Sequence, residues 1–115
     1  LAIDDLVPPG TPALIKLDVE GAEIAAIDGA ARALADGAVL IYEDHGFDLA
    51  CTVSAHLLSQ PEMRLYSIET GLRPMPDTAT IRALKSDHYK GYNFLAARVD
   101  SPLFSMIAAR FANPA

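Results

Sequence analysis

The amino-acid sequence predicts an α/β fold whose mixed sheet has a last strand that runs against the others. Two short apolar segments, 13–19 and 38–43, are each followed by a stretch with helical spacing. This alternation is typical of parallel strands joined by helical crossovers. Two later strand-like segments, 64–70 and 92–99, have no clear helix between them. A pair without a helical crossover is more easily antiparallel, so we expect the final strand to run against its neighbours.

The composition agrees with a folded chain that has one hydrophobic core. The sequence has 115 residues, of which 51% are hydrophobic and 21% are charged. A chain of this length buries most of the surface that it exposes when unfolded, and this much apolar material offsets the entropy of ordering. We therefore treat residues 1–115 as one unit, with no repeat and no low-complexity tract.

The first predicted strand follows a cluster of turn residues. Pro8, Pro9, Gly10 and Pro12 interrupt regular structure before the apolar run Ala13–Val19. A short run of this kind, bounded by turn signals, is typical of a strand that is buried on both faces of a parallel sheet.

A helix is predicted next, because apolar residues recur along one face. Ile24, Ile27, Ala31 and Leu34 are spaced three, four and three residues apart. Gly37 stands where a left-handed residue would end the helix. We expect one continuous helix up to this glycine.

The same unit repeats once in the following segments. Residues 38–43 form the second predicted strand, which ends in Glu43-Asp44-His45-Gly46, and a helix is expected from Asp48 to Gln60 before Pro61. Crossovers of this length are nearly always right-handed, so the two strands are expected to be parallel neighbours.

The carboxyl-terminal part has two further signals. Ser101 and Pro102 are suited to the N-cap and first position of a short helix that runs to Arg110. The polar stretch 71–91 is predicted to be a long connection, and it is our candidate for the segment that faces a substrate.

Charge and hydropathy exclude several classes of function. The chain carries 9 Lys and Arg against 15 Asp and Glu, a net charge of −6. Nucleic-acid backbones would be repelled, so we predict no nucleic-acid partner. The longest apolar run is far shorter than the roughly 18–20 residues that cross a bilayer, so we predict no membrane span. The one cysteine, Cys51, allows no internal disulfide and favours a cytoplasmic location.

Polar residues at two strand ends are the candidate functional residues. Asp18 and Glu20 follow the first strand, and Glu43 and His45 follow the second. In open α/β sheets, ligands bind beyond the carboxyl ends of the strands, so these side chains are expected to meet. Carboxylates this close repel one another unless a proton or a cation neutralises them. One of these groups could then act as a general base, or the oxygen-rich set could hold a divalent metal ion.

Each of these residues also has a purely structural interpretation. Acidic residues such as Glu20 and Glu23 stabilise a helix start, and a histidine beside a glycine is often only solvated. Cys51 is interpreted as a small core residue of its helix. Asn93, at the start of an apolar strand, either caps that strand or faces the site, and sequence alone leaves both alternatives open.

Four segments of the chain resemble one known family in the same order. They are Ile15–Glu23 (IKLDVEGAE), Ile3–Leu6 (IDDL), Ile41–Glu43 (IYE) and Asn93–Ala96 (NFLA). The first is similar to the signature of the FkbM family of S-adenosylmethionine-dependent methyltransferases. The resemblance covers about residues 3 to 98.

The resemblance implies the carboxyl-terminal half of a Rossmann-like class I methyltransferase fold. The chain would supply strands four to seven with their flanking helices, and the seventh strand would lie antiparallel between the fifth and sixth. The implied reaction moves a methyl group from S-adenosylmethionine to a hydroxyl of a small molecule, sugar or natural product. The resemblance places Asp18 and Glu20 beside the transferred methyl group.

The sequence lacks the features with which the family holds its cofactor. The glycine-rich turn and the acidic residue that hold the cofactor have no counterpart in these residues, and no phosphate-binding motif occurs. We therefore expect the chain to be a partial domain without the cofactor-binding half. We also expect the isolated chain to bind S-adenosylmethionine weakly or not at all and to be inactive.

Two other functions are compatible with the sequence. A non-catalytic docking or regulatory module could keep the fold and form homo-oligomers through an exposed edge of the first strand. The second of these functions is magnesium-dependent phosphoryl transfer at Asp18 and Glu20. Acidic residues at a helix start would, however, repel the anionic substrate of such a site.

Overall fold

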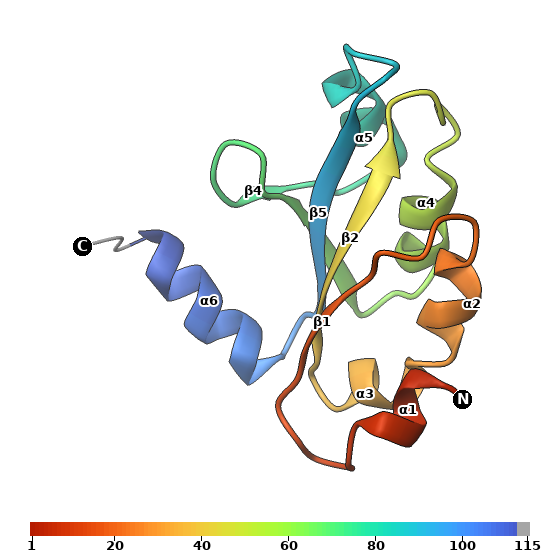
Figure 1. The fold of residues 1–115 in the computed structure, drawn as a ribbon. Coiled ribbons are helices and arrows are strands. Elements are labelled where there is room, and N and C mark those ends of the chain that lie inside the picture. Colours follow the sequence, from red (N-terminus) through yellow and green to blue (C-terminus); the bar gives the residue numbers. More distant parts are fainter. Residues whose placement is uncertain (113–115) are drawn as a thin grey trace.

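The computed structural model describes residues 1–112 and has a five-stranded mixed sheet at its centre (Figure 1). The spatial order of the strands is β1-β2-β5-β3-β4. Their bounds are β1 Leu14–Lys16, β2 Val39–His45, β3 Met63–Ser67, β4 Arg73–Pro74 and β5 Gly91–Arg98. β1 and β2 are parallel, whereas β5 runs antiparallel to both of its neighbours, β2 and β3. The predicted mixed sheet with an antiparallel last strand is therefore confirmed.

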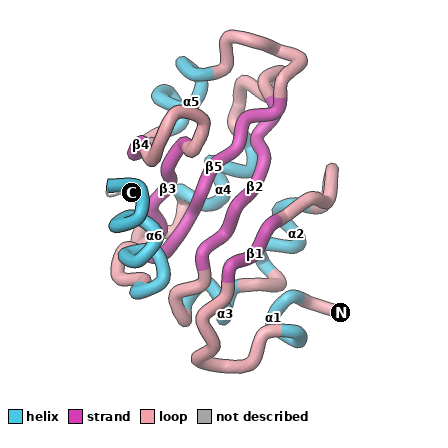
Figure 2. The backbone as a smooth tube through the Cα atoms, turned by 60° about the vertical axis from the view of Figure 1, so that its left-hand side comes forward, coloured by secondary structure: helices cyan, strands magenta, loops and turns pink. Residues whose placement is uncertain are grey.

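Helices cover both faces of this sheet, but unequally. Their bounds are α1 Ile3–Leu6, α2 Glu23–Asp28, α3 Ala31–Ala35, α4 Thr52–Leu58, α5 Thr78–Leu84 and α6 Pro102–Ala112. Figure 2 shows α6 in front of the sheet and α2 and α4 behind it. None of the helices within residues 1–112 is long and apolar enough to span a bilayer.

The main core lies between the sheet and the helices α2 to α5. Alternate residues of β2, such as Leu40 and Tyr42, point into it together with Phe94 of β5. The Tyr42 and Phe94 rings are stacked with centroids 5.8 Å apart. Because side chains alternate along a strand, Val39, which precedes Leu40, faces α6 in a second, smaller cluster. Apolar area removed from water on both faces stabilises the sheet.

The first predicted helix is not continuous, and this prediction was wrong. The chain forms α2 and then α3, with a break at Gly29 and Ala30. In an unbroken helix the Ala33 N–H would bond the Gly29 carbonyl. Here that carbonyl accepts from Asp4 N at 2.9 Å, and the Asp4 carboxylate accepts from the N–H groups of Arg32 and Ala33, both at 2.9 Å. A residue of α1 thus supplies a new helix start.

The first strand is shorter and more exposed than the sequence suggested. β1 contains three residues, Leu14–Lys16, and its one hydrogen-bonded neighbour within the described part of the chain is β2. Leu14 is 59% exposed, so this strand is not buried on both faces. The apolar run predicted the strand correctly, but a run of residues cannot show how many neighbours a strand has.

Two further helix predictions need correction. The helix expected from residue 48 begins only at Thr52, and Cys51 precedes it in the left-handed region with φ 52°. The stretch 71–91 is not an unstructured connection, since it contains β4 and α5. Asp77 caps α5 by accepting hydrogen bonds from the backbone N and the hydroxyl of Thr80 at 2.8 and 2.7 Å.

The carboxyl-terminal helix and the glycine cap are confirmed. α6 begins at Pro102, and the Ser101 hydroxyl accepts from Phe104 N at 3.1 Å. Gly37 ends α3 in the left-handed region with φ 97°. The Ser101 hydroxyl also donates to the Gly37 carbonyl at 2.6 Å, which ties α6 to the end of α3.

Candidate functional site

The candidate site lies where β1 and β2 end at the same edge of the sheet. After Lys16 the chain stays beside β2 for one more residue, because Leu17 N bonds Ile41 O at 2.9 Å. It then turns back at Gly21, whose φ of 80° suits glycine. This turn brings exposed Glu20 over the end of β2.

Three of the four predicted site residues come together at this edge. His45 Nε2 lies 3.1 Å from Glu43 Oε1 and 3.7 Å from Glu20 Oε1. The His45 side chain is 31% exposed, and those of Glu43 and Glu20 are 45% and 86% exposed. Parallel strand ends meet at one edge, which is why spacing alone predicted this cluster.

Asp18 lies at the same edge without joining this contact. It lines a small hollow together with Glu20, Glu43 and His45. Within residues 1–112 it makes no ion pair with them, and no group of three or more His, Cys, Asp or Glu side chains there is arranged to hold a metal ion. The predicted convergence therefore holds for Glu20, Glu43 and His45 and is looser for Asp18.

A glycine gives Glu43 its position. Gly91 of β5 pairs with His45 across the sheet. A Cβ atom at residue 91 would collide with the Glu43 carboxylate. The carboxylate therefore occupies the space that any other residue at this position would fill, and it lies within hydrogen-bond reach of His45.

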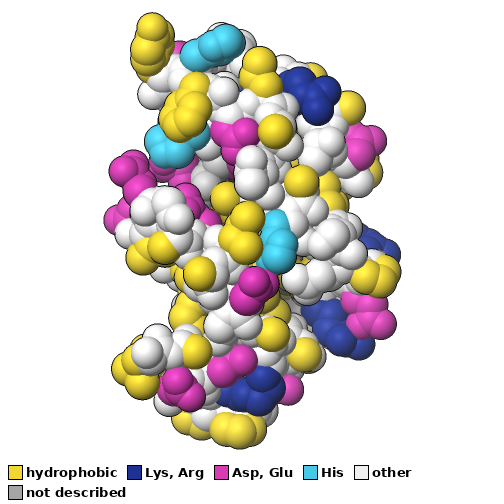
Figure 3. Space-filling view, turned by 90° about the vertical axis from the view of Figure 1, so that its right-hand side faces the viewer, with side chains coloured by type: hydrophobic (Ala, Val, Ile, Leu, Met, Phe, Trp, Pro, Cys, Tyr) yellow, Lys and Arg dark blue, Asp and Glu magenta, His cyan; other side chains and the backbone are white. Residues whose placement is uncertain are grey.

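A groove of about 500 Å³ opens beside these side chains. Its lining residues are Glu20, Gly21, Glu23, Glu43, Asp44, His45, Phe47, Asp48 and Val53. Figure 3 shows acidic side chains and a histidine gathered on one side of this face of the molecule. The lining contains five carboxylates and no Lys or Arg; the charge of Asp44 is balanced by buried Lys85 behind it, and the other four carboxylates give a field that favours positively charged ligands.

Phe47 was not predicted and is the exposed aromatic residue of the groove. Its side chain is 68% exposed, and its ring centroid lies 5.0 Å from that of His45. An exposed aromatic ring offers an apolar surface on which a ligand can rest. The sequence signal was weak, because Phe47 stands alone in a polar turn.

The structure supports neither interpretation of Asn93, which lies inside β5 and does not cap it. Its backbone N donates to Glu69 Oε2 at 2.7 Å, and its side-chain amide lies 3.4 Å from the same oxygen. It lines a separate hollow with Lys16, Ile41, Ile68 and Glu69. Asn93 thus fixes Glu69 and does not line the groove that holds His45.

Charge and hydrogen bonds alter the acidity of two groups near the site. The hydrogen bond from Lys90, 2.8 Å from Glu69, lowers the pKa of this carboxyl, and the Asn93 N–H lowers it further. Burial raises the pKa of the Cys51 thiol, which therefore stays protonated. Cys51 is fully buried, as predicted, and is not a nucleophile in this state.

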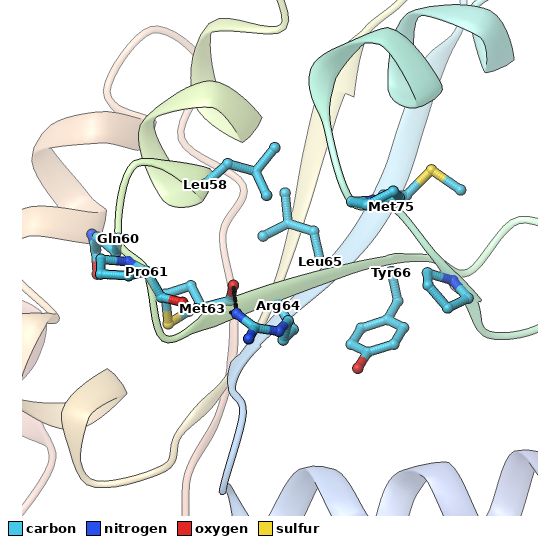
Figure 4. Close-up of a pocket in the computed structure, with 10 residues that line it drawn as sticks. Leu58, Gln60, Pro61, Met63, Arg64, Leu65, Tyr66 and Met75 are labelled. Carbon is cyan, nitrogen blue, oxygen red and sulfur yellow. Dashed lines mark hydrogen bonds between the residues drawn. The ribbon is translucent and has the colours of Figure 1, made fainter.

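A second hollow, of about 360 Å³, lies beside β3 (Figure 4). Most of its lining is apolar, and Leu58, Leu65 and Met75 contribute to it. Among its lining residues the one charged side chain is Arg64, whose guanidinium donates to the Pro61 carbonyl at 2.8 Å. A carboxylate or histidine that could serve as a general acid or base is not among these side chains, so the groove at His45 is the candidate site.

Comparison with protein-family models, with curated proteins and with solved structures finds no match to this chain.

Proposed function

We propose that the protein transfers a methyl group from S-adenosylmethionine to a hydroxyl of a small molecule, sugar or natural product, at the groove beside His45. The observation that carries this proposal is the distance of 3.1 Å between His45 Nε2 and Glu43 Oε1. A histidine held by a carboxylate at the carboxyl edge of an α/β sheet has the arrangement of a general base.

The order of the strands supports the proposal. β5 lies antiparallel between β2 and β3. The resemblance of residues 15–23 to the FkbM signature implies this arrangement for the last strand. Sheet order and signature are independent observations, because one depends on long-range pairing and the other on local sequence.

The residues of the groove supply proton transfer to this reaction. The Glu43 carboxylate, 3.1 Å from Nε2, favours a proton on this nitrogen by its charge, which leaves Nδ1 of His45 as the nitrogen that can accept the proton of the acceptor. The acceptor oxygen forms its bond to the methyl carbon as the carbon–sulfur bond breaks, and the hydroxyl proton passes to His45. The Glu43 carboxylate then stabilises the imidazolium.

The donor fits the chemistry of the groove. S-adenosylmethionine supplies a methyl group that is already activated by a positively charged sulfonium. Asp18 and Glu20 present carboxylates to this edge, and negative side chains stabilise such a cation. Positioning rather than covalent catalysis is then the main task of the protein.

The reaction class is tested with a donor that carries an isotopic label in its methyl group. The protein in its full natural length is incubated with this donor and a series of hydroxyl compounds, and products are identified by mass. Labelled methyl ethers are the expected product. Label found only on nitrogen or carbon atoms, or on no acceptor at all, would refute methyl transfer to oxygen.

One observation favours a second function, that of a docking module. Among residues 1–112 no strand pairs with the outer edge of β1, and Leu14 on this strand is 59% exposed. An unpaired edge with apolar side chains can pair with another chain. A solution mass that rises with protein concentration would support a homo-oligomer, and a concentration-independent monomer would argue against this function.

A further inference from the structure

A buried lysine reaches the turn that carries the groove's histidine and phenylalanine. Lys85 follows the last residue of α5, and its side chain is fully enclosed, with an exposure of 0%. Its Nζ lies 2.5 Å from Asp44 Oδ1 and 2.6 Å from the carbonyl oxygen of Asp48. One ammonium group therefore bonds the chain on both sides of residues 45–47.

The partner carboxylate is fixed from its other side as well. Asp44 Oδ2 accepts a hydrogen bond from the Ser54 hydroxyl at 2.6 Å. The Ser54 oxygen lies 2.8 Å from the Tyr42 hydroxyl, which must be the donor because Ser54 already donates to Asp44. Burial raises the pKa of Tyr42, so its phenol keeps this proton.

The turn between Asp44 and Asp48 is also held by backbone hydrogen bonds. Gly46 N donates to the Lys90 carbonyl at 2.8 Å, and Asp48 N donates to the His45 carbonyl at 3.0 Å. A Cβ atom at Gly46 would collide with the carbonyl of Asp87. The segment that carries His45 and Phe47 is therefore held by Lys85 on one side and by the 87–90 turn on another.

Stability alone does not account for this ion pair. Removing two charges from water costs free energy, and well-packed apolar residues in place of a buried pair are often as stable or more so. A buried pair is better explained where its directed hydrogen bonds specify one geometry. Here the geometry that it specifies is that of the turn lining the groove.

We propose that Lys85 is a positioning residue for the candidate site: by bonding Asp44 and the Asp48 carbonyl together, it fixes His45 and Phe47 relative to each other. The inference rests on the assignment of His45 to the proposed site. It does not depend on methyl transfer as the reaction, since it concerns the geometry of the turn. Its failure and the failure of the proposed function are therefore separate results.

The test compares a neutral double variant, Asp44→Asn with Lys85→Met, with the unaltered protein. The asparagine oxygen at position 44 can still accept from the Ser54 hydroxyl, so the variant leaves no isolated buried charge. The matched control is Glu62→Gln with Arg98→Met, which removes a surface ion pair of 2.5 Å outside the groove, together with the 2.8 Å contact of Arg98 with Asp100. Amide hydrogen exchange is followed at residues 45–48 and, as a measure of global folding, in β5.

In the double variant we expect exchange at residues 45–48 to accelerate by roughly tenfold or more while β5 stays protected. The nuclear Overhauser contact between the His45 and Phe47 rings, whose centroids are 5.0 Å apart, should weaken. The control variant should change neither signal. Unchanged exchange and an unchanged ring contact in a folded double variant would overturn the proposal.

A measurement on the unaltered protein covers the case in which the double variant does not fold. An enclosed ammonium exchanges its protons slowly, so the Lys85 Nζ–H signal should be visible and should correlate with the Asp48 carbonyl carbon across the hydrogen bond. A Lys85 ammonium that exchanges as fast as those of exposed lysines would also overturn the proposal.

Discussion

His45 and Glu43 share one face of strand β2, and Nε2 of the histidine lies 3.1 Å from Oε1 of the glutamate. Residues two apart on a strand point to the same side, so this contact follows from their spacing. It also needs the space above Gly91, which no other residue would leave open.

Gly91→Ala should therefore impair activity more than stability. The added methyl group meets the flexible Glu43 carboxylate, which can turn away at little cost to folding but then leaves His45. We expect unfolding free energy to change by no more than about 0.5 kcal/mol and methyl transfer to fall roughly tenfold or more. Thermal unfolding and turnover, measured on the same sample, separate the two effects.

Gly46→Ala should have the opposite profile and serves as the matched comparison. Its methyl group meets backbone, the Asp87 carbonyl, which cannot move without the 87–90 turn. Overpacking of this kind costs about 1–3 kcal/mol of unfolding free energy, which denaturant titration would measure. If the Gly46→Ala protein were as stable as the unaltered one, the close contact between Gly46 and the Asp87 carbonyl would be contradicted.

Asp4→Ala should destabilise the start of α3. The Asp4 carboxylate accepts from Arg32 N and Ala33 N, and these donors have no other helical partner once α2 ends at Asp28. We expect a lower Tm and faster amide exchange at these two residues. Asp5→Ala is the control, because the Asp5 carboxylate accepts from the Ala2 N–H at the first turn of α1 and, within residues 1–112, bonds no group of α3.

The Glu69 carboxylate should make stability depend on pH in the acid range. The Lys90 hydrogen bond lowers its pKa below the usual 4.5, and the Asn93 N–H adds to this effect. A lowered folded-state pKa contributes stability that is present above pH 4.5 and is lost as the pH falls through the folded-state value.

The variant Glu69→Gln isolates this contribution. The difference in unfolding free energy between this variant and the unaltered protein should be constant near neutral pH and shrink as the pH falls below 4.5. Lys90→Met should move the Glu69 pKa back toward its ordinary value, as followed by carboxyl-carbon NMR. A stability difference between the Glu69→Gln variant and the unaltered protein that does not vary with pH would contradict this account.

Local signals predicted the parts of the fold that depend on neighbouring residues. The apolar run at 38–43 specified β2, and Ser101 with Pro102 specified the start of α6. The break between α2 and α3 could not be predicted in this way, because its cause is Asp4, whose carboxylate bonds a backbone group 28 residues later. Spacing within 24–34 describes one helix face equally well with or without the break.

The candidate site was likewise predicted only in part. Glu20, Glu43 and His45 were predicted to meet because they follow or end two neighbouring strands, and this prediction needs only the order of the two strands. Lys85 was not predicted, because it stands 41 residues from Asp44 and the residues that follow it in the sequence are polar and exposed. Burial of a charge depends on tertiary packing, which sequence spacing does not reveal.

The most direct test of the proposed function is the turnover of His45→Gln, measured on the protein in its full natural length with labelled S-adenosylmethionine and a hydroxyl acceptor. His56→Gln is the control, because His56 is also paired with a carboxylate, Asp28 at 2.7 Å, but lies outside the groove. We predict that His45→Gln lowers kcat by about 10² to 10⁴ and that His56→Gln does not. Equal turnover in all three proteins, or no methyl transfer by any of them, would contradict the proposal.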